Sequence, residues 1–275
     1  WSLDRTTTPL ADGTYTVSAS VTDAAGNVGI TSRSITIDTT APTAGTLAGR
    51  TTGGANVILT DSGPLSAPGE AIITTDRDFK IDYTGGNGTS NTYLKSSDGA
   101  TWTTVNTSAF QESSASEGTY YYKVEASDTA GNVATSNILI VKVDLTAPLL
   151  SSSSPTDNAT GVASMNSIVL TFNENVYAGS GSVTISNGTT DTRTIAITDS
   201  AQVSVSGNQV TINPANDLLE NTNYWVQIAS GALTDGAGNI YGGINNNTTL
   251  NFKTGINNLP PVLSLLSTTA FTEDA

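Results

Sequence analysis

A five-residue pattern, Asp-Xaa-Ala-Gly-Asn, occurs three times in this chain of 275 residues, and its spacing limits what the chain can fold into. The copies begin at Asp23 (DAAGN), Asp128 (DTAGN) and Asp235 (DGAGN), so that they are 105 and 107 residues apart. A period of this length is too long for a solenoid repeat and fits a β-sandwich of roughly 100 residues. The spacing therefore predicts β-sandwich domains in tandem.

The sequence around the pattern repeats as well. DGTYTVSASVTDAAGN at 12–27 aligns without gaps with EGTYYYKVEASDTAGN at 117–132. Downstream, IDTTAP at 37–42 matches VDLTAP at 143–148. The repeat thus includes the end of each domain and the short linker that follows it.

The segments before the pattern alternate between apolar and polar residues, which is typical of half-buried strands. The predicted inward positions are Tyr15, Val17, Ala19 and Val21 in the first copy and Tyr120, Tyr122, Val124 and Ala126 in the second. The acidic-Gly-Thr-Tyr opening resembles the tyrosine corner near the start of strand F in immunoglobulin-like sandwiches. Strand G would then follow at 30–37 and 137–143, which makes the Asp-Xaa-Ala-Gly-Asn segment the F–G loop.

The other strand-like runs are separated by Gly, Asn, Asp and Ser clusters, and no stretch has convincing helical periodicity. These runs are 56–60, 78–84, 91–97 and 101–105 in one domain, and 166–176, 182–186, 192–198, 208–214, 222–230 and 248–254 in the next. We predict an all-β chain of immunoglobulin-like Greek-key sandwiches in an extended array. The expected domains are 43–144 and 149–254, flanked by the last strands of another at 1–38 and the start of a further one at 260–275.

Composition restricts the chemistry of the chain. Lys and Arg total 10 and Asp and Glu total 24, which gives a formal net charge of −14 and argues against binding of nucleic acid or anionic membrane. The chain contains no His and no Cys, so Ser-His and Cys-His catalysis and histidine-ligated metal sites are excluded. Catalysis by carboxylates alone remains open, but the sequence offers no convincing acid pair. We therefore expect no enzymatic activity and no catalytic or cofactor-binding residues.

The motifs together resemble known bacterial repeats. DGTYTV, the Asp-Xaa-Ala-Gly-Asn pattern and DTTAP look like the bacterial immunoglobulin-like repeats of large surface adhesins and biofilm-associated proteins. SSSPTDNATGVASMNSIVLTFNENV at 152–176 resembles a second such subfamily, found in S-layer and adhesin arrays, and PPVLSLLSTTAFTEDA at 260–275 resembles the start of a cadherin-like repeat. This resemblance implies a stalk segment at the cell surface, with calcium stiffening the junctions between domains.

Immunoglobulin topology independently predicts where acidic residues gather. The F–G loop of one domain and the E–F turn of the preceding domain should both meet the linker, and carboxylate and amide oxygens suit Ca²⁺. The candidate ligands are Asp12, Asp38, Asp128 and Asn132 at the first junction, Glu117, Asp144, Asp235 and Asn239 at the second, and Asp23 and Asn27 in the first loop. Glu174 could join the second set. Asp, Gly and Asn are also ordinary turn residues, so a purely structural loop is the competing interpretation.

A stalk has rivals in other classes of function. A carbohydrate-binding module or an accessory module of a secreted glycan-active enzyme would need exposed aromatic side chains. Tyr224 and Trp225 are adjacent, so one must face away from the core, either as a sugar-stacking ring, as a cover for a sheet edge or as an interface residue. For a stalk, the expected partners are neighbouring repeats of the same chain, with a host or matrix glycan or protein bound by distal domains.

Overall fold

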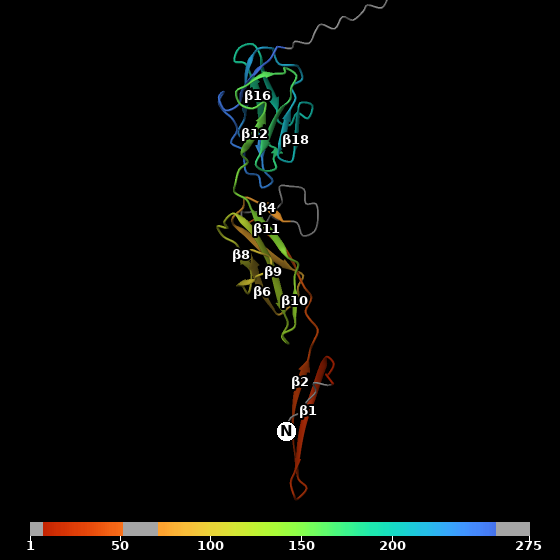
Figure 1. The fold of residues 1–275 in the computed structure, drawn as a ribbon. Helices are drawn as coiled ribbons and strands as arrows, with labels where there is room; N and C mark the ends of the chain where they lie inside the picture. The colour runs from red at the N-terminus through yellow and green to blue at the C-terminus, as the bar shows by residue number, and fades with distance from the viewer. Residues whose placement is uncertain (1–7, 52–70, 257–275) are drawn as a thin grey trace, which may run out of the picture. The chain divides into compact units, whose positions relative to one another are not determined.

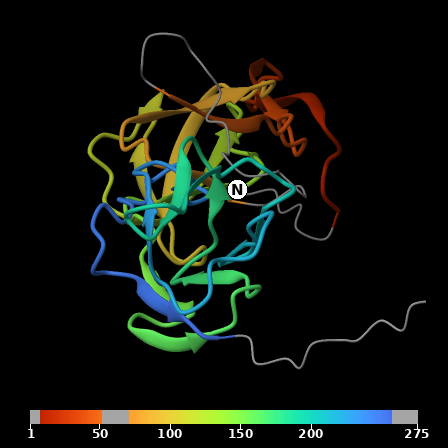
Figure 2. The same cartoon turned by 90° about the horizontal axis from the view of Figure 1, so that it is seen from above.

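The computed structural model describes residues 8–51 and 71–256, so the predicted strand at 56–60 and the predicted further domain at 260–275 lie outside the described residues. Strands are the regular elements throughout the described ranges, and two views of the ribbon show this (Figure 1, Figure 2). Among these residues there is accordingly no helix that could cross a membrane. The chain divides into two compact units, with the boundary between Thr146 and Ala147.

The first unit begins with a two-stranded hairpin. Strands β1 (Gly13–Thr22) and β2 (Val28–Ile37) pair antiparallel along their whole length, from Gly13 opposite Ile37 to Thr22 opposite Val28. The first Asp-Xaa-Ala-Gly-Asn copy forms the turn between them, as predicted for an F–G loop. Thr14 and Thr36 contact each other through their hydroxyl groups across the strands, 3.3 Å apart.

The rest of the first unit is a two-sheet sandwich. One sheet has the order β4-β11-β9-β6-β7, with β10 also paired to β9, and the other has the order β3-β5-β8. Strand β4 runs parallel to β11, and the other pairs are antiparallel. The strands are β3 (Thr46–Thr51), β4 (Ile72–Thr74), β5 (Phe79–Thr84), β6 (Ser90–Ser96), β7 (Thr103–Asn106), β8 (Phe110–Gln111), β9 (Gly118–Ser127), β10 (Val133–Thr135) and β11 (Leu139–Val143).

Both sheets contribute to the core of this sandwich. The ring of Phe79 on β5 meets that of Tyr122 on β9 edge to face, with centroids 6.0 Å apart. Val124 is fully buried, which confirms the inward face predicted for β9. The tyrosine corner is confirmed as well, because the Tyr120 hydroxyl donates to the carbonyl of Ser116 at 2.9 Å. The hairpin has the same contact, because the Tyr15 hydroxyl donates to the carbonyl of Ala11, also at 2.9 Å.

The second unit is a larger sandwich with the same plan. Its sheets have the orders β12-β14-β19-β18 and β13-β22-β20-β16-β17, and β15 pairs with β21 outside them. Again one short early strand, β13, runs parallel to the last strand, β22. The strands are β12 (Leu150–Ser154), β13 (Ala159–Val162), β14 (Ile168–Phe172), β15 (Tyr177–Ala178), β16 (Ser182–Ser186), β17 (Thr192–Ala196), β18 (Val203–Ser206), β19 (Gln209–Ile212), β20 (Asn223–Ile228), β21 (Leu233–Thr234) and β22 (Asn251–Thr254).

Aliphatic side chains from both sheets fill the core of the second unit, and aromatic pairs close it. Leu170, Val183 and Val210 are fully buried, each on a different strand. Phe172 and Tyr241 meet edge to face with ring centroids 5.1 Å apart. Because the alternation of β14 and β16 puts every second residue into this core, the predicted period of two is confirmed here.

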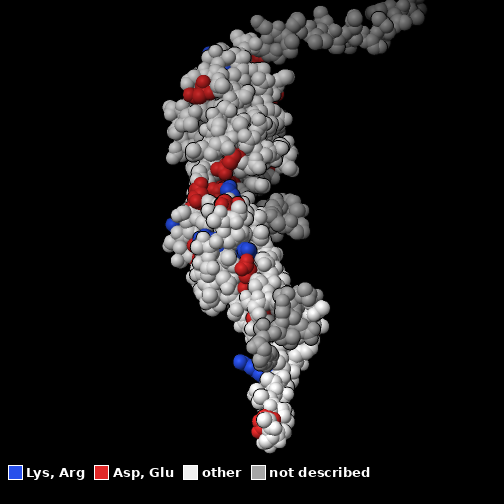
Figure 3. All heavy atoms as spheres, turned by 60° about the horizontal axis from the view of Figure 1, so that its bottom comes forward, with Lys and Arg blue, Asp and Glu red and all other residues white. Residues whose placement is uncertain are grey.

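The surface carries few charges. On the face drawn in Figure 3, scattered acidic side chains lie on a largely uncharged surface, with fewer basic ones among them. This agrees with 24 acidic and 10 basic residues in the chain. Such a surface favours solubility and contact with cations.

Candidate functional site

The first Asp-Xaa-Ala-Gly-Asn copy is a loop closed by its own hydrogen bonds. Asp23 Oδ1 accepts from the backbone N–H groups of Ala25 and Asn27, both at 2.9 Å. Asp23 Oδ2 accepts from the Asn27 side-chain amide at 2.9 Å. The backbone N–H of Asp23 donates to the carbonyl of Asn27 at 3.0 Å, and Gly26 adopts a φ of 89° that favours glycine.

The other two copies have the same construction. Asp128 accepts from the N–H groups of Ala130 and Asn132 at 2.8 and 2.9 Å and from the Asn132 side chain at 2.8 Å. Asp235 accepts from the N–H and the side-chain amide of Asn239, both at 2.7 Å. The pattern therefore encodes one loop conformation, in which aspartate and asparagine side chains stabilise each other.

These hydrogen bonds also favour the charged form of the aspartates. The side-chain amide of Asn27 holds the pKa of Asp23 below its usual value, and that of Asn132 does the same for Asp128. These internal hydrogen bonds agree with the interpretation of the pattern as a structural loop. A carboxylate still has lone pairs left after two or three hydrogen bonds, and these lone pairs are able to accept a cation.

Asp12, in the turn before β1, contacts the linker that leaves the hairpin. Its Oδ1 accepts from the backbone N–H of Thr39 at 2.9 Å and from the Thr39 hydroxyl at 2.6 Å. Its Oδ2 accepts from the Thr40 hydroxyl at 2.6 Å. Asp38 Oδ1 in turn accepts from the N–H of Thr40 at 3.1 Å. The two threonine side chains hold the pKa of Asp12 below its usual value.

The next linker begins in the same way. Glu117 Oε2 accepts from the Thr146 hydroxyl at 2.7 Å, and Asp144 Oδ1 accepts from the N–H of Thr146 at 3.2 Å. Asp144 Oδ2 also forms an ion pair with Lys142 Nζ at 2.8 Å. Sequence reasoning missed the threonines as partners, although Thr40 and Thr146 occupy equivalent positions of the two linkers and so provided the signal.

The first junction does bring the predicted residues together, by hydrogen bonds through the linker backbone. The Asn132 amide donates to the carbonyl of Asp38 at 3.0 Å while it also donates to Asp128. Further along the linker, the N–H of Thr43 donates to Asn87 Oδ1 at 2.6 Å. Within the described ranges, however, the carboxylates of the three aspartates predicted at this junction do not form a group with ligand atoms within 4.8 Å of one another.

The second unit contains a close pair of carboxylates. Oxygen atoms of Glu174, which follows β14, and of Asp235 in the third loop lie within 4.8 Å of each other. Two like charges at this distance repel, and a divalent cation between them would replace repulsion with attraction. The oxygen donors fit a hard cation such as Ca²⁺, which takes 6–8 oxygen ligands.

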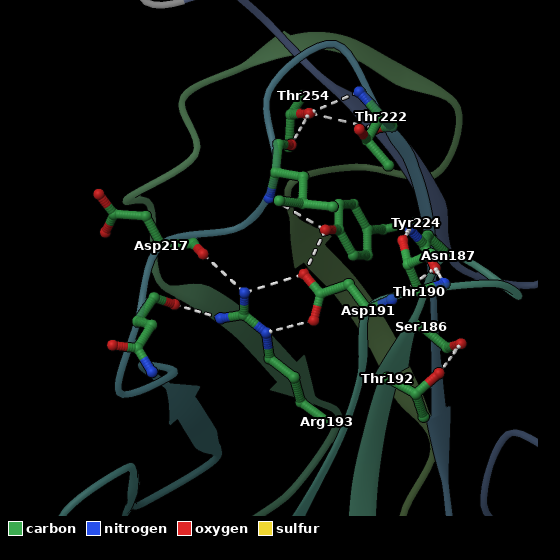
Figure 4. A network of polar contacts seen from close by, with 12 residues as sticks. Ser186, Asn187, Thr190, Asp191, Thr192, Arg193, Asp217, Thr222, Tyr224 and Thr254 are labelled. Atoms are coloured by element: carbon green, nitrogen blue, oxygen red, sulfur yellow. Dashed lines mark hydrogen bonds and ion pairs between the residues drawn. The ribbon is translucent and has the colours of Figure 1, made fainter.

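A polar network in the second unit, shown in Figure 4, has its hydrogen bonds satisfied internally. Arg193 on β17 binds both oxygens of Asp191 at 2.9 Å and donates to the backbone carbonyls of Asn216 and Asp217. The Tyr224 hydroxyl donates to Asp191 Oδ2 at 2.5 Å. Arg193 beside Asp191 lowers the pKa of that carboxyl, and burial with the Asp191 bond raises the pKa of Tyr224 to about 12. The network fastens the start of β17 to β20.

The adjacent residues Tyr224 and Trp225 point to opposite faces of their sheet, as the alternation of a strand requires. Tyr224 is 1% exposed in the core, whereas Trp225 points away from it and is half-buried. The indole lies against the turn between β16 and β17, where a Cβ added to Gly188 would lie 2.4 Å from Trp225 Cη2. Trp225 therefore covers this turn, which favours the cover over the sugar-stacking interpretation.

Comparison with known proteins gives a family for parts of the chain. Residues 144–254 match a family described as bacterial Ig-like domain, and residues 1–39 match a second family of the same description. A search among curated proteins found no significant match.

Two solved structures resemble the chain weakly. The FN1–FN3 domains of chicken CNTN1 are 10% identical with a TM-score of 0.29, and the match covers 66% of this chain. The BSP domain of a biofilm associated protein is 16% identical with a TM-score of 0.19, and the match covers 68% of this chain. The chain spans 63% and 29% of the lengths of these structures. At such TM-scores neither likeness bears on function.

Proposed function

Because bacterial Ig-like domains make up residues 1–39 and 144–254 of this chain, we propose that it is a stalk segment of a bacterial cell-surface adhesin. The segment spaces a distal binding domain from the cell, and its partners are the neighbouring Ig-like repeats. Contact with a host or matrix glycan or protein belongs to the distal domains. Ig-like domains are typically non-catalytic, which agrees with a chain that has no His and no Cys.

One observation carries this proposal: the first linker is bonded to the structure on both of its sides. Asp12 holds Thr39 and Thr40, and Asn132 holds the carbonyl of Asp38. Pro42 follows at once and fixes its own φ, which restricts the linker further. A spacer needs short joints of limited freedom, whereas a binding module has no such requirement.

Calcium is the second part of the proposal. Glu174 and Asp235 would supply carboxylate ligands in the second unit, and the linker acid Asp144 would join them by the topology argued from the sequence. A bound Ca²⁺ would supply a positive charge that joins these acids. The support for this part is the carboxylate pair in the second unit together with the net charge of −14.

Small-angle scattering and thermal unfolding test both parts. In Ca²⁺ we expect a larger maximum dimension and a higher melting temperature than in chelator. Glu174→Gln should lose most of the calcium effect, whereas Glu220→Gln, at an exposed acid of the same unit, should keep it. If the maximum dimension and the melting temperature are the same with Ca²⁺ and with chelator, the calcium part is wrong. If the particle is compact under both conditions, the stalk itself is wrong.

A further inference from the structure

Both linkers leave their modules through the same contact between an acidic residue and a threonine. Asp12 and Glu117 occupy equivalent positions before the Gly-Thr-Tyr sequence, and Thr40 and Thr146 occupy equivalent positions in the linkers. The hydroxyl-to-carboxylate distances are 2.6 Å at the first linker and 2.7 Å at the second. The same contact at equivalent positions of two repeats indicates that it is a feature of the repeat and not a chance contact.

A second contact at each linker fixes the threonine backbone. The N–H of Thr40 donates to Asp38, and the N–H of Thr146 donates to Asp144, at 3.1 and 3.2 Å. Each linker threonine is therefore held by its hydroxyl from the turn of the module and by its N–H from the preceding linker acid. Charge-assisted hydrogen bonds of this kind are stronger than neutral ones.

At the first linker the following module adds a third contact. The two N–H bonds of the Asn132 amide are divided between Asp128 in its own loop and the carbonyl of Asp38. The Asp-Xaa-Ala-Gly-Asn loop thus presents a fixed donor to the linker, because its aspartate holds the asparagine side chain in place. None of these contacts requires an ion.

From this geometry we infer that Asp12 and Glu117 are linker-positioning residues, which with Thr40 and Thr146 form a metal-independent clasp that sets the direction of each linker. The clasp goes beyond the proposed stalk function, because it assigns part of the stiffness of the linkers to hydrogen bonds. It also removes Asp12 and Glu117 from the predicted calcium ligands. The clasp and calcium then act on the same joints through different residues.

Double electron–electron resonance in chelator tests the clasp, and a chain without cysteine accepts spin labels only at introduced sites. Labels at Ser18 on β1 and Thr104 on β7, both exposed, report the freedom of the first linker. We expect a narrow distance distribution for the parent chain and one about twice as wide for Thr39→Val/Thr40→Val, since hydrogen bonds to a charged acceptor are lost. Thr36→Val, which removes a hydroxyl from the hairpin alone, is the matched control.

The outcomes separate the clasp from calcium. Equal widths for the parent chain and the double variant in chelator would overturn the clasp, whether both are narrow or both are broad. Calcium affinity of the double variant and of Asp12→Ala should equal that of the parent chain, and a loss of calcium affinity in Asp12→Ala would make Asp12 a metal ligand and overturn the assignment. If the double variant misfolds, Thr146→Val with labels at Thr104 and Ser204 gives the same test at the second linker. Failure of the calcium part leaves each of these expectations unchanged.

Discussion

The polar network of the second unit predicts a specific loss of stability when the charge of Asp191 is removed. In Asp191→Asn the amide keeps the size of the side chain, but Arg193 loses its counter-ion and Tyr224 loses a charged acceptor. The side chains of Asp191 and Arg193 are 14% and 19% exposed, so solvent replaces these interactions only in part. We expect the free energy of unfolding to fall by about 2 kcal/mol, which is within the range for a hydrogen bond to a charged group and below that for a broken, fully buried ion pair.

The assay is urea and thermal unfolding of the second unit, followed by the fluorescence of Trp225. A loss of this size corresponds to a melting temperature lower by about 8 °C for a domain of about 110 residues. Asp217→Asn is the matched control, because Arg193 contacts the backbone carbonyl of Asp217 and not its side chain. The control should change the free energy of unfolding by less than about 0.5 kcal/mol.

The dependence on pH supplies the refuting result. The pKa of Asp191 is lowered in the folded state, so its contribution is present above the unfolded value of about 4 and is lost as the pH falls through the folded value. The difference between the parent chain and Asp191→Asn should therefore shrink as the pH falls below the unfolded value and through the lower folded one. A difference that stays constant between neutral and acid pH, or an Asp217→Asn effect of equal size, would show that the charge of Asp191 is not the cause.

Three further predictions concern single side chains. Tyr120→Phe removes the tyrosine-corner hydrogen bond and should lower the free energy of unfolding of the first unit by about 1 kcal/mol in urea titration, whereas Tyr121→Phe on the outer face should not. Gly188→Ala forces a Cβ against Trp225 at a φ of 77°, and should cost about 1–3 kcal/mol and shift the indole emission; an unchanged spectrum would contradict the contact. Burial and the carboxylate of Asp191 raise the pKa of Tyr224, so ultraviolet titration should show its hydroxyl ionising with a pKa of about 12. Its contribution to stability is present below the unfolded value of about 10 and is lost as the pH rises through about 12. Ionisation at the ordinary value would contradict the network.

Strands that carry regular alternation were predictable from the sequence, whereas strands such as β4 and β12 were not. The segment around Val124 alternates over ten residues, so its inward face followed from period alone. Strand β4 has only three residues, and its strand conformation depends on parallel pairing with β11, which is distant in the sequence. Strand β12 consists of Leu150 and four serines, which have little intrinsic preference for strands.

The sequence predicted where the polar residues of the first linker lie, but it did not predict their hydrogen-bond partners. The repeated linker acids and the topology placed Asp12, Asp38 and Asn132 in one region, where Asp12 bonds to Thr39 and Asn132 bonds to the carbonyl of Asp38. Each of these groups has a backbone N–H or carbonyl among its partners, and such groups leave no trace in residue identity. The threonines were detectable, because Thr40 and Thr146 occupy equivalent positions in the two linkers. A prediction of metal ligands from carboxylates and amides does not consider hydroxyl donors.

The parallel pairing of an early strand with the last strand of each sandwich has a mechanical consequence. In the first unit β4 pairs with β11, and in the second β13 pairs with β22, so the strands near the two ends of each module are bonded side by side. Tension applied through the two linkers would pull such strands past each other in shear, and every hydrogen bond between them would carry load at once. Forced unfolding is governed by the height of the barrier to the first rupture rather than by equilibrium stability. The free energy of unfolding of each sandwich is therefore not a measure of its resistance to stretching, which depends on the rupture of this parallel strand pair.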